Sequence, residues 1–367
     1  MSRGDGLWRS VAVAVAVALP RRRGAARSRR EWSACYAPHT SMFFDQHGVV
    51  RACCQNTEVP LGDVRTQSLE EIWTSAAAER LRSSLEAGDY GAGCEFCGWE
   101  VERLGAKLLF ARGFDHLRPD ERRPAFPTHW ELALTNTCNL QCTMCDGDLS
   151  SAIRAQREHR PPLPEVYGDA FFEQLEAFLP HVRHVKLLGG EPFLGRAPLR
   201  LLDRLCELDA PPEVTITTNG TIWNARVERI VSVLRPRLNV SIDGATPDTF
   251  AEIRVGADLD GVLANLDRFE GHVGRSRVSM AICLMRANVH EFADLLELAE
   301  RRQIYAGVNV LRFPESASLY TLEVEELERT VALLRARRPV LTSSRQRVWS
   351  GQLAALEHHL ATGSGAR

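Results

Sequence analysis

From residue 130 onward, short apolar segments that alternate like half-buried strands take turns with longer segments whose apolar positions recur every three or four residues. The predicted strands are Trp130–Leu134, His184–Leu188, Glu213–Thr217, Leu238–Ile242, Arg277–Leu284 and Gly307–Leu311. The predicted helices are Phe171–Leu179, Ala197–Leu208, Ala225–Leu234, Leu259–Phe269 and Val289–Arg301. Alternation of strand and helix is typical of βαβ units, so an α/β fold with a parallel sheet is predicted for residues 129–315.

Residues 32–104 have a different pattern and are predicted to form a small hairpin-plus-helix domain. The apolar runs on either side of Asp45-Gln-His-Gly48 predict a β-hairpin with glycine at the turn. Further along, Ser68 and Glu71 have the spacing of a capping box, which predicts a helix from residue 69. A second helix is predicted to run through Arg80–Leu85.

The remaining segments are simpler. Residues 105–128 are predicted to be a linker, because Arg118–Pro127 is polar and punctuated by proline. Residues 316–367 contain two amphipathic stretches, Thr321–Arg335 and Gln346–Leu360, which predict a C-terminal helical extension. Residues 1–31 are expected to be a disordered leader. Their apolar run Val11–Leu19 is much shorter than the roughly 18–20 residues that a membrane span needs, and three arginines follow it.

Charge and composition exclude some classes of partner. The 367 residues include 45 Lys and Arg against 47 Asp and Glu, a net charge of −2. No bulk attraction to nucleic acid or to an anionic membrane is therefore expected. Nearly all of the positive charge is arginine, since lysine occurs only at Lys107 and Lys186.

The ten cysteines are clustered, which bears on the chemistry of the chain. Eight of them fall into two groups, at positions 35, 53, 54, 94 and 97 and at positions 138, 142 and 145, whereas Cys206 and Cys283 stand alone. Clusters of this kind favour metal binding over disulfides, and with it a reducing compartment. A cytoplasmic protein is expected. The two isolated cysteines are better explained as buried core thiols.

The second group has the spacing C-x3-C-x2-C, formed by Cys138, Cys142 and Cys145, on the loop after the first predicted barrel strand. Three thiolates on one loop can face a single inorganic centre and leave one metal position open. With Asn136-Thr137 ahead of it, this loop resembles the radical S-adenosylmethionine (SAM) superfamily. The alternatives are a structural zinc site and three unrelated cysteines.

The resemblance implies both a fold and a cofactor. In this family the three cysteines hold a [4Fe–4S] cluster, its fourth iron binds the amino and carboxylate groups of SAM, and reductive cleavage gives a 5′-deoxyadenosyl radical. The implied fold is a partial (β/α)6 TIM-type barrel, with its sites on the loops at the carboxyl ends of the strands.

Three of these loops carry motifs that resemble those of the family. Gly-Gly-Glu-Pro after the second strand resembles a motif that contacts the SAM amino group, and the loops after the third and fourth strands resemble the T-N-G and S-x-D-G turns of related enzymes. The candidate cofactor-binding residues are Gly189, Gly190, Glu191, Asn219, Ser241, Asp243 and Arg254. Ordinary glycine-closed turns and a solvated helix arginine are the alternatives.

The first cysteine group resembles another module. The order C-x12-G-x4-C, a Ser-Leu-x-Glu-Ile-Trp helix and C-x2-C resembles the SPASM/twitch auxiliary-cluster domain, here ahead of the barrel rather than behind it. The resemblance implies one auxiliary [4Fe–4S] cluster held by Cys35, Cys53, Cys94 and Cys97. Cys54 is the alternative to Cys53, since adjacent strand residues point to opposite faces. A zinc-stabilised module is the other interpretation.

The function implied by both resemblances is a radical SAM enzyme that abstracts hydrogen from an unidentified substrate, either a peptide side chain or a sugar- or aminocyclitol-like small molecule. The auxiliary cluster would aid oxidation of the substrate radical, and a reducing partner such as flavodoxin or ferredoxin would supply electrons. One alternative is an epimerase or carbon-skeleton enzyme with a structural N-terminal metal module, for which Cys283 is the candidate hydrogen donor. Another is a non-catalytic iron–sulfur or zinc protein.

Overall fold

The computed structural model describes residues 32–104, 110–337 and 339–363, and these residues form two compact units. The N-unit, as we call the first, comprises the described residues up to 135 together with 164–189. The C-unit comprises 136–163 and the described residues from 190 onward. The leader predicted for residues 1–31 lies outside the described residues.

The sheet of the N-unit combines a hairpin with two barrel strands. Its order is β3 (Gly62–Asp63), β2 (Val49–Arg51), β1 (Ser41–Phe44), β4 (His129–Leu132) and β5 (His184–Leu187). The hairpin pairs β1 with β2 in antiparallel fashion, as predicted, whereas β1, β4 and β5 are parallel. The hairpin domain and the first barrel strands therefore share one continuous sheet.

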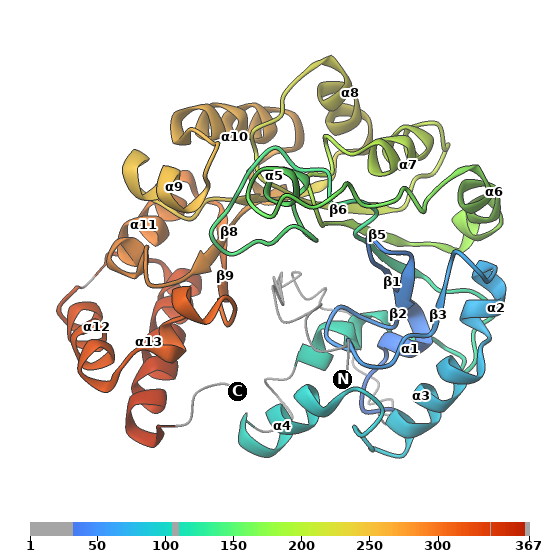
Figure 1. Ribbon diagram of the computed structural model, residues 1–367, viewed down its shortest axis with the longest axis horizontal. Coiled ribbons are helices and arrows are strands. Elements are labelled where there is room, and N and C mark those ends of the chain that lie inside the picture. Colours follow the sequence, from blue (N-terminus) through green and yellow to red (C-terminus); the bar gives the residue numbers. More distant parts are fainter. Residues whose placement is uncertain (1–31, 105–109, 338, 364–367) are drawn as a thin grey trace. The chain divides into compact units, whose positions relative to one another are not determined.

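One face of this sheet is covered by α6 (Asp169–Phe178), which lies beside β1 and β5 in Figure 1. The ring of Trp130 lies 6.2 Å from Phe44 and 6.4 Å from Phe178, and Phe44 is 5.7 Å from Phe171. All four rings are buried, so this face forms the apolar core of the N-unit. The neighbouring residues of the strands, Glu131 and Lys186 among them, belong to the opposite face.

Short helices complete the N-unit. They are α1 (Ala37–Thr40), α2 (Leu69–Trp73), α3 (Ala76–Glu86), α4 (Glu95–Leu104), η1 (Phe110–Leu117) and η2 (Leu179–His181). The predicted capping box is present, with Ser68 Oγ accepting from the backbone of Glu71 and the Glu71 carboxylate accepting from the backbone of Ser68. Part of the expected linker is helical, because η1 buries Phe114 and Leu117.

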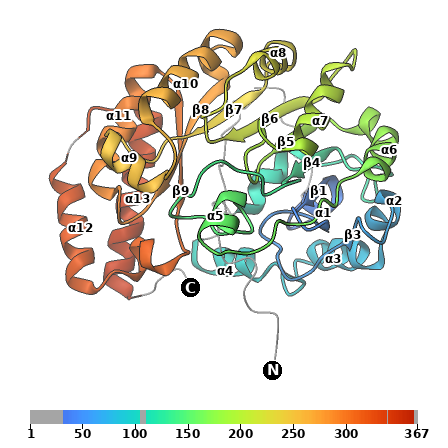
Figure 2. The ribbon, with the colours of Figure 1, turned by 45° about the horizontal axis from the view of Figure 1, so that its top comes forward.

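The C-unit contains four parallel strands, in the order β6 (Glu213–Thr218), β7 (Arg237–Ser241), β8 (Val278–Leu284) and β9 (Tyr305–Val310). Figure 2 shows helices on one face of these strands. They are α7 (Arg196–Cys206), α8 (Ala225–Leu234), α10 (Leu259–Val273) and α11 (Phe292–Arg302). Each helix buries an apolar stripe against the strands, while β8 is buried along its whole length.

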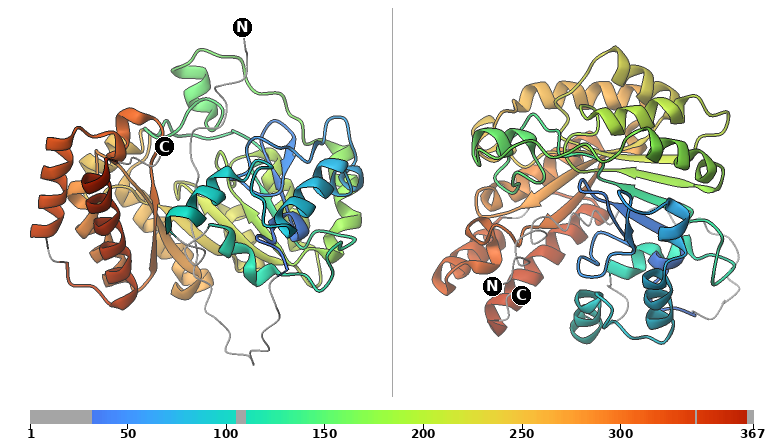
Figure 3. Two further views of the ribbon diagram at one scale, coloured as in Figure 1. Left: turned by 90° about the horizontal axis from the view of Figure 1, so that it is seen from below. Right: turned by 45° about the vertical axis from the view of Figure 1, so that its right-hand side comes forward.

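The other helices of the C-unit lie in loops or at its end. Two short ones, α5 (Ser151–Gln156) and α9 (Pro247–Ile253), follow β4 and β7 along the chain. The C-terminal α12 (Val324–Ala336) and α13 (Ser343–Thr362) run side by side in Figure 3 and are joined by an ion pair between Arg335 and Glu357. In the described part of the chain, no helix is both long and apolar enough to cross a bilayer.

The predicted α/β class is confirmed. Six parallel strands, β4 to β9 in chain order, alternate with helices as the partial barrel requires. The strand ends differ from the expected ones by up to two residues. For example, β4 ends at Leu132 instead of Leu134 because the chain turns into the cysteine loop there.

Candidate functional site

The loop that carries Cys138, Cys142 and Cys145 is fixed at both ends within the C-unit. Near α9, the backbone N–H groups of Gln141 and Thr143 donate to the carbonyls of Val255 and Ile253, each over 2.9 Å. Near α5, the Ser150 and Ser151 hydroxyls bond backbone atoms of the loop. These protein contacts hold the loop, which lowers the entropy cost of gathering three thiols.

The thiols of this loop differ in acidity. A hydrogen bond from Cys145 outweighs burial and, with help from Arg254, lowers the pKa of Cys142 to about 7. The same contact raises the pKa of Cys145 well above its usual value, whereas burial raises that of Cys138 to about 11. Cys142 is thus the thiol that most readily becomes a metal-binding thiolate.

Two polar side chains point at the sulfurs. Arg254 Nη1 lies 3.7 Å from the sulfur of Cys142, and Asn219 Nδ2 lies 3.9 Å from that of Cys138. Sulfur accepts long, weak hydrogen bonds, and donors of this kind tune metal-bound thiolates. Both donors were expected to contact SAM, so their nearness to sulfur is a relationship that the motifs did not reveal.

Arg254 is oriented by Asp243, which is fully buried. The Nε of Arg254 donates to Oδ2 of Asp243, and Oδ1 of the same carboxylate accepts from the backbone N–H of Cys283. Asn288 donates to the carbonyls of Asp243 and Cys283, at 2.8 and 2.9 Å. Asp243 thus acts in this structure as the support of Arg254, while contact of either residue with SAM stays a prediction.

Glu191 connects the Gly-Gly-Glu-Pro loop to the end of β6. Its carboxylate accepts from the backbone N–H groups of Phe193 and Asn219, at 3.0 and 2.7 Å, and from the Thr218 hydroxyl at 2.8 Å. Burial raises the pKa of Glu191, and these three donors partly offset the effect. Its backbone also donates to Thr137 of the cysteine loop, over 2.7 Å. The predicted SAM ligand therefore also braces the loop.

The glycines of this motif have left-handed backbones, with φ of 74° at Gly189 and 47° at Gly190. In the N-unit, a Cβ on Gly189 would come within 2.6 Å of the Ala133 side chain. Both conformation and space therefore demand glycine at position 189. Ser241 lies buried at the end of β7, as its predicted position on the strand implies.

An apolar cluster surrounds the thiols of the C-unit. Its buried members are Leu140, Cys142, Met144, Ile253, Cys283, Met285, Leu311 and Ala317, with Cys138 and Cys145 packed against them. Cys283 was predicted either as a core thiol or as a hydrogen donor, and it lies buried in this cluster beside Cys142. The cluster shields the sulfurs from water, which strengthens the electrostatic effect of Arg254.

In the N-unit, the four predicted auxiliary cysteines line one small cavity. They are Cys35 before α1, Cys53 after β2, and Cys94 and Cys97 at the start of α4. Burial raises the pKa of Cys35 and Cys97 to about 12 and that of Cys94 to about 11. Four thiols in one apolar cavity suit a metal centre, which deprotonates its ligands on binding.

The thiols of the adjacent residues Cys53 and Cys54 lie in different places. Cys53 lines the cavity, whereas the thiol of Cys54 lies toward Glu131 and Lys186 on the sheet face, where burial and the Glu131 charge raise its pKa to about 12. Asn56 adds a donor on the cavity side, with Nδ2 3.6 Å from the sulfur of Cys94. No sequence signal pointed to Asn56.

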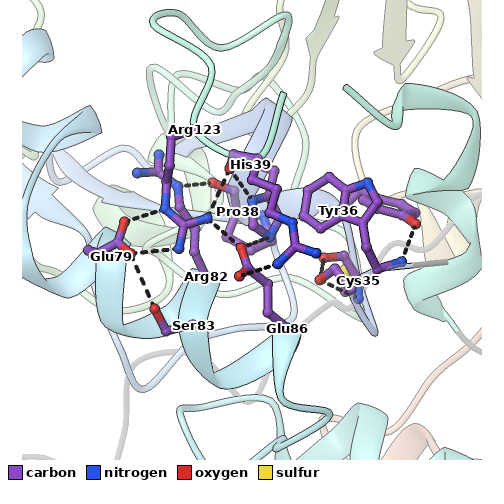
Figure 4. A network of polar contacts seen from close by, with 12 residues as sticks. Cys35, Tyr36, Pro38, His39, Glu79, Arg82, Ser83, Glu86 and Arg123 are labelled. Atoms are coloured by element: carbon purple, nitrogen blue, oxygen red, sulfur yellow. Dashed lines mark hydrogen bonds and ion pairs between the residues drawn. The ribbon is translucent and has the colours of Figure 1, made fainter. Parts of the chain in front are cut away.

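A polar network holds the segment that carries Cys35 (Figure 4). The buried Arg82 donates to the carbonyls of Pro38 and Trp73, each over 2.9 Å, and Arg123 bridges Glu79 and Glu86. His39 belongs to the same network, and its Nδ1 is 3.0 Å from the Arg122 carbonyl. Burial lowers the pKa of His39 to about 4, so this network contains a neutral imidazole.

Among the described residues, no three His, Cys, Asp or Glu side chains converge closely enough to hold a single metal ion. The four thiols of the N-unit line one cavity together. Four thiolates can hold a zinc ion or an iron–sulfur cluster, and the choice between them stays a prediction.

Comparison with protein families gives two matches. Residues 132–299 match the radical SAM superfamily, and residues 35–98 match the SPASM iron–sulfur cluster-binding domain. Together these ranges cover more than half of the chain, and they include both cysteine groups described above.

Curated relatives match only in part. The GTP 3′,8-cyclase of Ectopseudomonas mendocina is 32% identical over 178 residues, which is 48% of this chain and 51% of that enzyme. The GTP 3′,8-cyclase of Pseudomonas entomophila is 26% identical over 173 residues, or 47% and 50% of the two chains. The chain thus spans about half the length of the curated relatives that it matches.

Two solved structures are similar at a low level. Streptococcus suis SuiB bound to the precursor peptide SuiA is 16% identical, with 80% of this chain and 67% of that one covered and a TM-score of 0.39. The anSMEcpe structure with bound AdoMet is 15% identical, with 65% and 68% covered and a TM-score of 0.42. Similarity at this level supports no argument about function.

Proposed function

This chain belongs to the radical SAM superfamily and carries an iron–sulfur cluster-binding domain ahead of its radical SAM domain, and we propose that it cleaves SAM reductively to abstract hydrogen from an organic substrate. When bound, a [4Fe–4S] cluster with SAM supplies a 5′-deoxyadenosyl radical for this abstraction. Cys138, Cys142 and Cys145 would hold the cluster.

The observation that carries this proposal is the pair of donors aimed at the sulfurs of the cysteine loop. Arg254 brings a positive charge to Cys142, and Asn219 brings an amide N–H to Cys138. Donors of this kind stabilise thiolates that bind a metal centre, so they fit a role of these cysteines as cluster ligands. Glu191 and Asp243 hold these donors in place through buried hydrogen bonds.

The N-unit supports a second cluster. Its four thiols would hold an auxiliary [4Fe–4S] cluster, which supplies an electron acceptor for oxidation of the substrate radical. The match of residues 35–98 to an iron–sulfur cluster-binding domain favours this interpretation over the zinc module.

The substrate and partners are part of the proposal. We expect a peptide side chain or a sugar- or aminocyclitol-like small molecule as substrate, and an external reductant such as flavodoxin or ferredoxin. All ten cysteines are free, which is in keeping with a reducing compartment such as the cytoplasm. The proposed substrate class does not include GTP, the substrate in the name of the curated relatives, because the match covers only half of those enzymes.

The epimerase alternative rests on Cys283. Its place beside Cys142 keeps it near the cysteine loop, as a hydrogen donor requires, but it is 9% exposed and packed among apolar side chains. Cys283→Ala would abolish epimerisation and leave an oxidation intact, so product analysis of this variant separates the two reactions.

The first test is the iron and sulfide content of anaerobically reconstituted protein, next to a Cys138/Cys142/Cys145→Ala variant. About eight irons in the parent and about four in the variant are expected, together with 5′-deoxyadenosine from the parent alone under strong reductant. About four irons in the parent, none in the variant, and bound zinc would reduce the N-unit to a structural module and remove its role in oxidation. Lack of 5′-deoxyadenosine from fully loaded parent would overturn the proposed activity.

A further inference from the structure

Two opposite charges lie side by side on the sheet face of the N-unit that α6 does not cover. Glu131 of β4 and Lys186 of β5 are in register across two parallel strands, and Nζ of Lys186 is 3.5 Å from Oε2 of Glu131. Their chain neighbours Trp130 and Val185 are buried on the other face. No motif pointed to this pair, and the cysteine sites do not use it.

The pair is buried yet incompletely satisfied. Glu131 is 4% exposed, and among the described residues the contact of its Oε2 is the 3.5 Å ion pair with Lys186, which lacks hydrogen-bond geometry. His129 lies 3.4 Å from the other oxygen, and its own Nδ1 has no partner within the described chain. A buried carboxylate oxygen that is held by one long ion-pair contact can accept a further hydrogen bond from a ligand.

The ammonium of Lys186 has more hydrogen-bond donors than its ion pair with Glu131 uses. An ammonium carries three N–H donors, and among the described residues Glu131 is its ion-pair partner. The side chain of Lys186 is 19% exposed, three times as much as that of Glu131, so part of this side chain is open to a ligand. An ammonium with open donors in a partly dry setting is a binding site for an anionic group.

The choice of lysine is itself informative. Of the 45 basic residues of the chain, 43 are arginine and only two are lysine. An arginine at 186 could bond both oxygens of Glu131 in a bidentate pair. The compact ammonium instead contacts Oε2 over 3.5 Å, which leaves this oxygen able to accept a further hydrogen bond. A buried ion pair contributes little net stability, so stability alone does not account for it.

The pair lies next to the auxiliary cysteines. The thiol of Cys54 is close enough to Glu131 and Lys186 for both charges to act on it, and Lys186 also acts on Cys53. Cys53 lines the four-cysteine cavity. A ligand held by the pair would therefore lie beside the proposed electron acceptor.

We propose that Lys186 and Glu131 bind the polar end of the substrate, a carboxylate with a hydroxyl or amino group on the neighbouring carbon. Lys186 binds the carboxylate, and Oε2 of Glu131 accepts a hydrogen bond from the neighbouring hydroxyl or amino group. This inference rests on the proposed function and narrows its substrate to hydroxy or amino acids and molecules that carry such a group.

The test uses the fact that the chain has two lysines. Reductive ¹³C-methylation keeps the lysine charge and labels Lys107, Lys186 and the amino terminus. Lys107→Arg assigns the signals in NMR spectra of the anaerobically reconstituted protein. Three probes are titrated: L-lactate, acetate, which lacks the hydroxyl, and propane-1,2-diol, which lacks the carboxylate.

The expected result is a saturable shift of the Lys186 signal with L-lactate, a shift with acetate at about tenfold weaker affinity, and none with the diol. In Glu131→Gln, lactate and acetate should bind alike. If no probe shifts the Lys186 signal of the parent protein, the pair is purely structural and the proposal is wrong. This outcome is measured on the parent protein alone, so it does not depend on whether a variant folds. Formation of 5′-deoxyadenosine is measured on the same sample, so failure of this site and failure of the proposed function are distinguished.

Discussion

Arg254 donates a hydrogen bond from its Nη1 to the sulfur of Cys142, over 3.7 Å. The guanidinium can do this because Asp243 holds its Nε from the other side. A positive charge on a thiolate ligand favours the more negative, reduced state of a bound cluster. The two residues therefore couple the βα loop after β7 to the electronic properties of the cysteine loop.

Arg254→Gln is expected to lower the reduction potential of the cluster held by Cys138, Cys142 and Cys145. Loss of one charged donor of about 1 kcal/mol corresponds to roughly 40 mV for one electron. A redox titration followed by electron paramagnetic resonance measures the shift. Arg301→Gln, an exposed change on α11, serves as the matched control. A potential that is equal in both variants would contradict a tuning role.

Asp243→Asn is expected to destabilise the protein by about 3 kcal/mol, because it leaves the largely buried guanidinium of Arg254 without its carboxylate. Combining it with Arg254→Met should restore much of the loss, since no unpaired charge then remains. Urea unfolding of the anaerobic holoprotein gives both free energies. Additive losses in the double variant would show that the two residues do not act as a pair.

Glu191→Gln is expected to lower the free energy of unfolding by about 2 kcal/mol. The carboxylate accepts hydrogen bonds from three donors, and the NH2 group of the new amide would face one of them. The thermal midpoint should fall, and SAM binding by the reconstituted protein should weaken as the cysteine loop loses its brace. Glu228→Gln, an exposed change on α8, should leave both unchanged. Unaltered SAM binding in folded Glu191→Gln would argue against a role at the cofactor.

Cys53→Ala and Cys54→Ala form a matched pair of neighbouring substitutions. Only Cys53 lines the cavity with the other three auxiliary cysteines, so Cys53→Ala should lose about four irons and Cys54→Ala none. Iron and sulfide analysis after reconstitution measures this directly. The reverse result would exchange the two residues as ligands.

The pKa of Lys186 is expected to be higher than that of an ordinary lysine. Burial lowers it, but the Glu131 carboxylate outweighs burial and raises it, with His129 and Cys54 as the other titratable neighbours of the pair. A raised pKa in the folded state means that the pair stabilises the protein below pH about 10.4 and that this stability is lost as the pH rises through the folded value. A ¹³C NMR titration should show the Lys186 midpoint fall in Glu131→Gln. An unchanged midpoint would mean that the two charges do not interact.

The sequence predicted the strands, helices and cysteine groups well because each has a local signal. The apolar periodicity of β6 to β8 lies in consecutive residues, and Ser68 and Glu71 are three positions apart. The parallel pairing of β1 with β4 joins residues nearly 90 positions apart, and no local pattern encodes it. Tertiary pairing of this kind is set by packing, here by Phe44 against Trp130.

In the candidate sites, too, local motifs were predictable from the sequence and tertiary contacts were not. The motifs identified Glu191, Asn219, Asp243 and Arg254, but spacing alone could not tell whether these side chains face a cofactor, a sulfur or one another. Asn56 and the Glu131–Lys186 pair carried no motif at all. Lys186 did carry a compositional signal, since lysine is so rare in this chain.

The register of β1 against β4 has a consequence for the edge of the sheet in the N-unit. In a partial barrel the first strand would be an open edge, with backbone N–H and C=O groups free to pair with another chain. Here β1 occupies that edge of β4, and the sheet then ends in the two-residue strand β3, too short to recruit a partner. The cysteine-rich hairpin thus covers the edge of β4. A chain that lacks residues 32–104 is expected to aggregate through β4, whether or not its cysteine loop binds metal.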